Sequence, residues 1–244
     1  MNFANNMESP LTIHPPRKVA AGRGWAWIRE GFGYFMKAPL MWLGVIVVLF
    51  VISMLLNLIP LVGPLANALL PPVWSAGVLL GCHALHRNEQ LKFEHLFAGF
   101  GPSLKPLLIS GVIVMAMQVV VVLVLFGSLA FELRGEDAAA AQELAANPLS
   151  LLLRFVLLIV FMVPISAATL FAPALIMLSG QPVVEALRLS MKACFLNVGA
   201  VLVWGAIAIV LGMISAMLAG LGFLVLIPVL VVSGYLAYRD FFID

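Results

Sequence analysis

The chain has 244 residues, of which 64% are hydrophobic and only 10% are charged, and its mean hydropathy is +1.14. Soluble domains carry roughly 25% charged residues, so this composition excludes a protein that is mostly surrounded by water. The formal net charge of +2 is too small to suggest a nucleic-acid partner.

Residues 1–24 carry charges and prolines but no apolar core of their own. We expect them to form a disordered cytoplasmic tail without a cleavable signal peptide, followed by a single membrane domain over residues 25–244. That domain contains six apolar runs, each near or above the roughly 20 residues that a membrane-spanning helix needs. The expected spans are residues 38–59, 65–84, 106–131, 149–178, 198–218 and 221–238. The predicted fold class is all-α: a polytopic membrane bundle of six transmembrane helices with short interfacial amphipathic helices.

The fourth run is interrupted by Pro164 and Pro173. A proline within a span frees backbone groups that neighbouring helices or water must satisfy. One kinked span is the first interpretation, and a span followed by a short re-entrant segment is the alternative.

The basic residues fall almost entirely in alternate gaps between the runs, which predicts the orientation. Eleven of the thirteen lie on one side: Arg17, Lys18, Arg23, Arg29, Lys37, Arg87, Lys92, Lys105, Arg188, Lys192 and Arg239. Arg134 and Arg154 are the two exceptions. Because short loops rich in Lys and Arg stay cytoplasmic, both termini should be cytoplasmic. The loop that carries Glu136 should face the exterior.

Three short amphipathic segments precede the first, third and fifth runs, at residues 25–37, 93–100 and 184–192. In the first, the expected apolar stripe is Trp25, Ile28, Phe32 and Phe35. Such helices lie in the membrane interface with the apolar face toward lipid. They should act as anchoring elbows, or alternatively as a surface for anionic lipid or a partner protein.

The fifth run places Ala208, Gly212, Ala216 and Gly220 one turn apart on one helix face. Small residues let helix backbones approach closely. This stripe should pack the span against a neighbour in the same chain, and homodimerisation is the alternative. Residues 30–44 also align with residues 185–199, which suggests a parallel internal duplication.

Candidate chemical groups are few. Gln118 is the one strongly polar side chain near the middle of a run, and Arg154 lies just inside the fourth run. Both are candidates for an interhelical or a solute contact. His83, His86 and Cys82 invite a metal interpretation, but three or four convergent ligands are needed, so we expect no metal or cofactor. No nucleophile, base and orienting group assemble into a motif, and we expect no enzyme.

A family resemblance adds to this interpretation. The residues that carry it are 17–25, Phe35, Pro39, Trp42, 58–60, 76–77, 93, 96–100, 171–175, Ala186, Ser190, Ala193 and Asn197. They resemble a family of uncharacterised proteobacterial inner-membrane proteins with six spans. They are similar, more loosely, to the membrane domain of some bacterial glycerophosphodiester phosphodiesterases, although no catalytic phosphodiesterase domain is present. The resemblance implies a fold and a location, and no activity.

Two functional hypotheses follow. The first is a non-enzymatic membrane protein with an accessory, scaffold or lipid-interacting role, whose partners are the bilayer and either a second copy or another membrane protein. The second is a small transporter or channel for an uncharged or apolar solute. A water-accessible cavity that reaches Gln118 would favour transport, and a dry bundle core would favour the first hypothesis.

Overall fold

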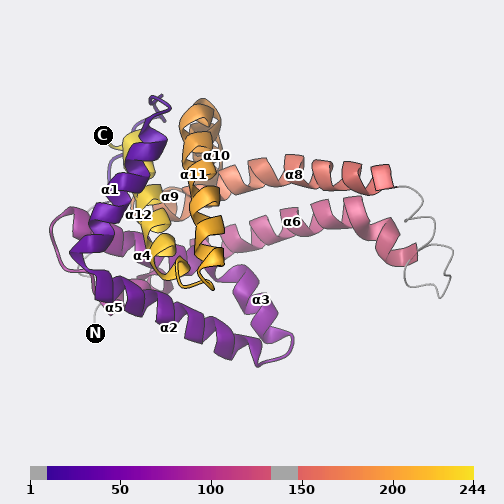
Figure 1. Ribbon diagram of the computed structural model, residues 1–244, viewed down its shortest axis with the longest axis horizontal. Coiled ribbons are helices and arrows are strands. Elements are labelled where there is room, and N and C mark those ends of the chain that lie inside the picture. The colour runs from indigo at the N-terminus through magenta and orange to yellow at the C-terminus, as the bar shows by residue number, and fades with distance from the viewer. Residues whose placement is uncertain (1–9, 133–147) are drawn as a thin grey trace.

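The computed structural model describes residues 10–132 and 148–244, and every regular element within them is a helix (Figure 1). In chain order these are α1 (Arg23–Lys37), α2 (Pro39–Asn57), α3 (Val62–Leu69), α4 (Pro71–His86), α5 (Phe93–Leu96), the 3-10 helix η2 (Ala98–Phe100), α6 (Leu104–Glu132), α8 (Pro148–Leu170), α9 (Ala172–Met177), α10 (Val183–Leu196), α11 (Val198–Met217) and α12 (Phe223–Phe242). The all-helical class is confirmed for this part of the chain.

Five segments of the described residues are long and apolar enough to cross a membrane. They are Pro39–Asn57, Leu104–Gly127, Leu149–Met177, Val198–Met217 and Phe223–Phe242. A sixth results if α3 and α4, which meet at an angle of 45°, are counted together as one broken span. The predicted runs therefore correspond to helices, five of them directly and one as a bent pair.

The second run, expected as a span over residues 65–84, is divided into α3 and α4 by a bend that was not predicted. Pro71 and Pro72 follow Leu70 directly. Neither proline has an N–H to donate to the preceding turn, so the helix ends at Leu69 and α4 starts again with a proline in its first turn. In the fourth run, Pro164 lies inside α8, and α9 follows after Phe171. These two helices form one candidate span, as the kinked interpretation predicts.

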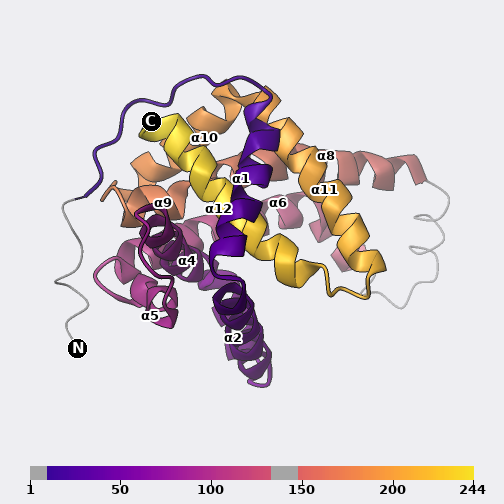
Figure 2. The same ribbon diagram turned by 60° about the vertical axis from the view of Figure 1, so that its left-hand side comes forward.

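The core lies where α1, α4, α9, α10 and α12 meet (Figures 1 and 2). Half of the α12 span is buried, against 11% of the α2 and α11 spans, so α12 is the central helix. Its Phe241 makes edge-on ring contacts with Trp27 and Phe171, both at 5.4 Å between centroids. By contrast, α6 and α8 pair as a hairpin whose far half extends beyond the other helices (Figure 1).

The three amphipathic segments form α1, α5 with η2, and α10. The apolar stripe expected on α1 is split, however, because Ile28 and Phe35 are buried while Trp25 and Phe32 are about half exposed. Two glycines explain the choice of face. A Cβ on Gly24 would lie 2.4 Å from a backbone oxygen of α11, and one on Gly31 would lie 2.8 Å from a backbone oxygen of α12. These close approaches pack α1 against protein through its glycine face and leave a second apolar face outward.

Residues 10–22, here called the N-terminal strap, differ from the disordered tail that was expected up to residue 24. The backbone N–H of Leu11 donates to the Leu178 oxygen, that of His14 to Phe242, and that of Arg17 to Phe241. Arg23 and Gly24 already belong to α1. The strap is ordered because it satisfies carbonyl oxygens at and beyond the ends of α9 and α12, which have no partner within their own helices. Residues 1–9 lie outside the described residues.

Candidate functional site

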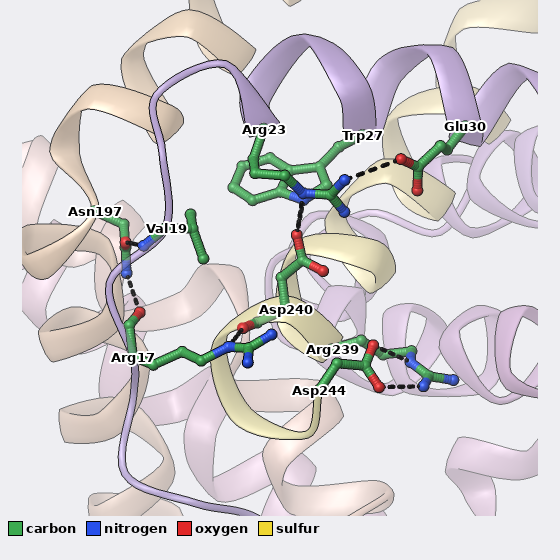
Figure 3. Close-up of polar contacts among 9 residues, drawn as sticks. All are labelled: Arg17, Val19, Arg23, Trp27, Glu30, Asn197, Arg239, Asp240 and Asp244. Atoms are coloured by element: carbon green, nitrogen blue, oxygen red, sulfur yellow. Dashed lines mark hydrogen bonds and ion pairs between the residues drawn. The ribbon is translucent and has the colours of Figure 1, made fainter.

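The richest polar network in the described part of the chain surrounds the end of α12 (Figure 3). Asp240 is its centre: the carboxylate Oδ2 accepts a hydrogen bond from Arg23 Nε at 2.6 Å and another from Trp27 Nε1 at 2.7 Å. Arg23 also donates from Nη1 to Glu30 at 3.1 Å. The network therefore ties the first and second turns of α1 to the last turn of α12.

The strap is joined to the same region by the side chain of Asn197, which lies between α10 and α11. Its Oδ1 accepts from the backbone N–H of Val19 at 2.7 Å, and its Nδ2 donates to the backbone oxygen of Arg17 at 2.9 Å (Figure 3). Arg17 Nε in turn donates to the backbone oxygen of Asp240 at 2.7 Å. Asn197 is 3% exposed. The buried Asn197 amide therefore forms one accepted and one donated hydrogen bond with the strap backbone, as a neighbouring β-strand would.

The end of the chain carries a further ion pair, in which Arg239 binds both carboxylate oxygens of Asp244. This hydrogen bonding holds the pKa of the Asp244 carboxyl below its usual range. The network is rich in charge, but its groups bind each other and the backbone. We call the network of Arg17, Arg23, Trp27, Asn197 and Asp240 the clasp, because it joins the strap, α1, α12 and the junction of α10 and α11.

Two histidine–tyrosine pairs lie beside the clasp and connect α1, α4 and α12. Tyr34 Oη is 2.8 Å from His86 Nδ1, and Tyr235 Oη is 2.9 Å from His83 Nδ1. Lys37 Nζ lies 4.5 Å from the centre of the Tyr34 ring. Each imidazole has a tyrosine partner, and no three His, Cys, Asp or Glu side chains converge as metal ligands among the residues described.

The two site candidates from the sequence, Gln118 and Arg154, are not brought together. Phe126 of α6 contacts Phe155 of α8, at 5.6 Å between ring centroids. Gln118 lies eight residues before Phe126, about 12 Å along the helix at 1.5 Å per residue. Arg154 is half-buried, and its Nη1 is buried without a hydrogen-bond partner in the described residues. Gln118 is exposed on the outside of α6.

The small polar side chains inside the bundle are satisfied. Ser110, Thr169, Ser215 and Ser233 each donate to a backbone oxygen one turn earlier in their own helix. Ser190 of α10 bonds to α8, donating to the Ala167 oxygen and accepting from the Phe171 N–H. The core therefore uses its hydroxyl groups to complete helix backbones.

A groove of about 510 Å³ runs along the start of α6. Its lining residues extend from Gly101 to Ile113 and do not include Gln118. Lys105 lies at the start of this lining, and the residues deeper along α6 are apolar. The groove is a surface feature and does not connect Gln118 with the interior.

Sequence reasoning missed the clasp. No role was predicted for Asp240, because the orientation rests on the basic residues alone. Asn197 was noted only as part of the family resemblance. A signal was present in both cases: an acidic residue at the end of the last apolar run, and an asparagine between an amphipathic segment and a span. Neither signal identifies its partner.

Comparisons with known proteins agree with a membrane protein. The chain is similar to a Burkholderia thailandensis protein named "Probable inner membrane protein", with 25% identity over 243 residues, which cover 92% of this chain and 90% of that protein. No family model and no solved structure matches the chain. Nothing in these comparisons supports the looser likeness to the membrane domain of glycerophosphodiester phosphodiesterases.

Proposed function

We propose that this chain is a multi-pass protein of the bacterial inner membrane, with six spans and both termini cytoplasmic, that has an accessory, scaffold or lipid-interacting role and no catalytic activity. The observation that carries the proposal is the state of its polar groups. The serine hydroxyl groups inside the bundle bind backbone of their own or neighbouring helices, whereas Gln118, the one amide midway along α6, lies outside. Polar groups within a membrane mark a solute pathway when they face a shared interior.

The location rests on two supports. Apolar helices long enough to span a bilayer make up most of the described chain. The similar Burkholderia protein bears the name of an inner membrane protein.

The lipid-interacting part of the proposal rests on the segment that precedes α6. Phe93, Phe97 and Phe100 are each about 40% exposed, and Trp74 stacks edge-on against the last two. Aromatic side chains are enriched at the level of lipid headgroups. With Lys105 on the first turn of α6, this edge has the composition of a membrane interface.

Solute flux separates the proposal from the transporter alternative. Purified protein in liposomes is subjected to a glycerol or urea gradient, and swelling is followed by stopped-flow light scattering. We expect the swelling rate of protein-free liposomes. Faster swelling that Gln118→Leu abolishes would instead establish a solute pathway. Native mass spectrometry of the same preparation should show retained lipid or a co-purified membrane protein.

The orientation is tested separately with single cysteines at Glu136 and Arg188. Glu136 lies outside the described residues, and Arg188 is exposed on α10. In intact cells with a permeabilised outer membrane, an impermeant maleimide should label Glu136→Cys and not Arg188→Cys, and lysed cells should label both. Both native cysteines are buried and provide the unlabelled baseline. Labelling of Arg188→Cys alone would reverse the topology.

A further inference from the structure

We infer that two copies of this chain associate through α6, with Gln118 of each copy hydrogen-bonded to Gln118 of the other. This inference is independent of the proposed function, because neither a scaffold nor a transporter requires it.

The first observation is where Gln118 lies. Among the described side chains of α6, the buried ones are Leu107, Ser110 and Gly111, all in its first third. A Cβ on Gly111 would lie 2.7 Å from the Leu69 oxygen, so α3 covers the helix at that point. Gln118 comes two turns later on the same face, and it is exposed. It therefore lies just beyond the part of α6 that the rest of the bundle covers.

The second observation is the surroundings of this amide. The Gln118 side chain makes no hydrogen bond to any residue that the structure describes. Its neighbours Val119, Val120 and Val122 are all between 46% and 57% exposed. The span Leu104–Gly127 has no charged residue after Lys105. Gln118 lies close to its midpoint, about 20 Å along the helix from Lys105 at 1.5 Å per residue.

An amide in that position needs a partner from outside the chain. Hydrocarbon offers no hydrogen bonds, and an unpaired polar group there is strongly unfavourable. Lipid tails cannot hydrogen-bond to the Gln118 amide, and the lipid headgroups are too far from it. The partner must therefore be a polar side chain of another transmembrane helix at the same depth.

A second copy of this chain meets that need directly. A carboxamide both donates and accepts, so it is complementary to itself, and a two-fold axis places a residue against its own copy. Toward the end of α6, Val121 and Leu125 follow Gln118 at steps of three and four. This spacing forms the contact seam of a left-handed helix pair, in which a single polar residue sets register and partner number.

The test measures dimerisation of the full chain in liposomes. Energy transfer between copies labelled at an Arg188→Cys position gives a dissociation constant as the protein-to-lipid ratio is varied. Gln118→Leu removes the amide at similar size, and we expect it to weaken the dimer by about tenfold. Gln118→Asn keeps the amide and should retain most of the affinity. Circular dichroism should show equal helix content in all three proteins.

Disulfide trapping locates the contact. Gln118→Cys should form a cross-linked dimer in membranes treated with copper phenanthroline. Ala116→Cys, also exposed but on the opposite face of α6, should remain monomeric. Cys82 and Cys194 are buried and are present in both variants.

Three results would overturn the inference. One is a wild-type chain that remains monomeric at every protein-to-lipid ratio. Another is a Gln118→Leu dimer as strong as wild type. The last is a dimer that Gly212→Leu disrupts and Gln118→Leu does not, which would assign the interface to the small-residue stripe on α11.

Discussion

Replacing Asp240 by alanine should destabilise the bundle by about 3 kcal/mol. The carboxylate is 13% exposed and binds two donors, Arg23 and Trp27. A hydrogen bond to a charged group contributes about 1.5–3 kcal/mol, and leaving a buried donor unpaired costs about 1–3 kcal/mol. The Arg23 side chain is 35% exposed and keeps Glu30, so solvent screening places its share at the low end. Trp27 is 1% exposed, so solvent cannot replace the lost acceptor of its indole N–H. This unpaired N–H therefore contributes most of the lost stability.

Two further variants separate these contributions. Asp240→Asn retains an oxygen that can accept from Trp27 and should lose only about 1–1.5 kcal/mol. On a Trp27→Phe background, Asp240→Ala should cost about 1–2 kcal/mol less than it does in the wild type, because no indole N–H is left unpaired. The assay is reversible unfolding in mixed micelles of dodecyl maltoside and SDS, followed by circular dichroism. The reasoning fails if Asp240→Ala lies within about 0.5 kcal/mol of wild type, or if the asparagine variant is as unstable as the alanine variant.

The remaining predictions concern other elements. Gly24→Ala should destabilise by about 1–3 kcal/mol in the same assay, because its Cβ would overlap the α11 backbone. Gly33→Ala on the same helix, where a Cβ meets nothing within 4 Å, should be neutral or slightly stabilising; equal effects would refute the packing of α1 on α11. Burial lowers the pKa of His95, so the unfolded chain takes up the proton first, and stability should fall as the pH drops below about 6.5. His95→Gln should flatten that slope, as measured by thermal unfolding between pH 5 and 7.5; an unchanged slope would exclude His95 as its source. Burial raises the pKa of the Cys194 thiol to about 12, so neither it nor the buried Cys82 should react with maleimide at pH 7.5 until SDS unfolds the protein, and prompt native labelling would contradict this burial.

The long apolar helices were predictable because a membrane imposes a length and a composition on the helices that cross it. The run expected at 198–218 corresponds to α11 at Val198–Met217, and the run expected at 38–59 to α2 at Pro39–Asn57. Hydropathy alone predicted one apolar run through Pro71 and Pro72, because a hydropathy scale takes no account of the N–H that proline lacks. The bend between α3 and α4 was therefore readable from the sequence, but only by a different rule.

The inner face of α1 was harder to predict. Trp25 and Trp27 are equally apolar, and helical spacing permits either to be buried. Gly24 and Gly31 decide the matter, because they allow the close approach that buries Trp27. The clasp could not be predicted at all: Asp240 and Arg23 are 217 positions apart, and no local pattern connects them. Gln118 was predicted to make an interhelical or solute contact, and because it has no hydrogen bond within the described residues, that contact stays a prediction.

The strap has a consequence for the order of folding. Its hydrogen-bond partners are Leu178, Asn197, Asp240, Phe241 and Phe242, and all of them are synthesised after most of the membrane domain. The strap must therefore remain without these hydrogen-bond partners until the ribosome has nearly finished the chain. A nascent chain arrested before residue 240 should leave its amino-terminal segment open to protease, and release of the completed protein should close it.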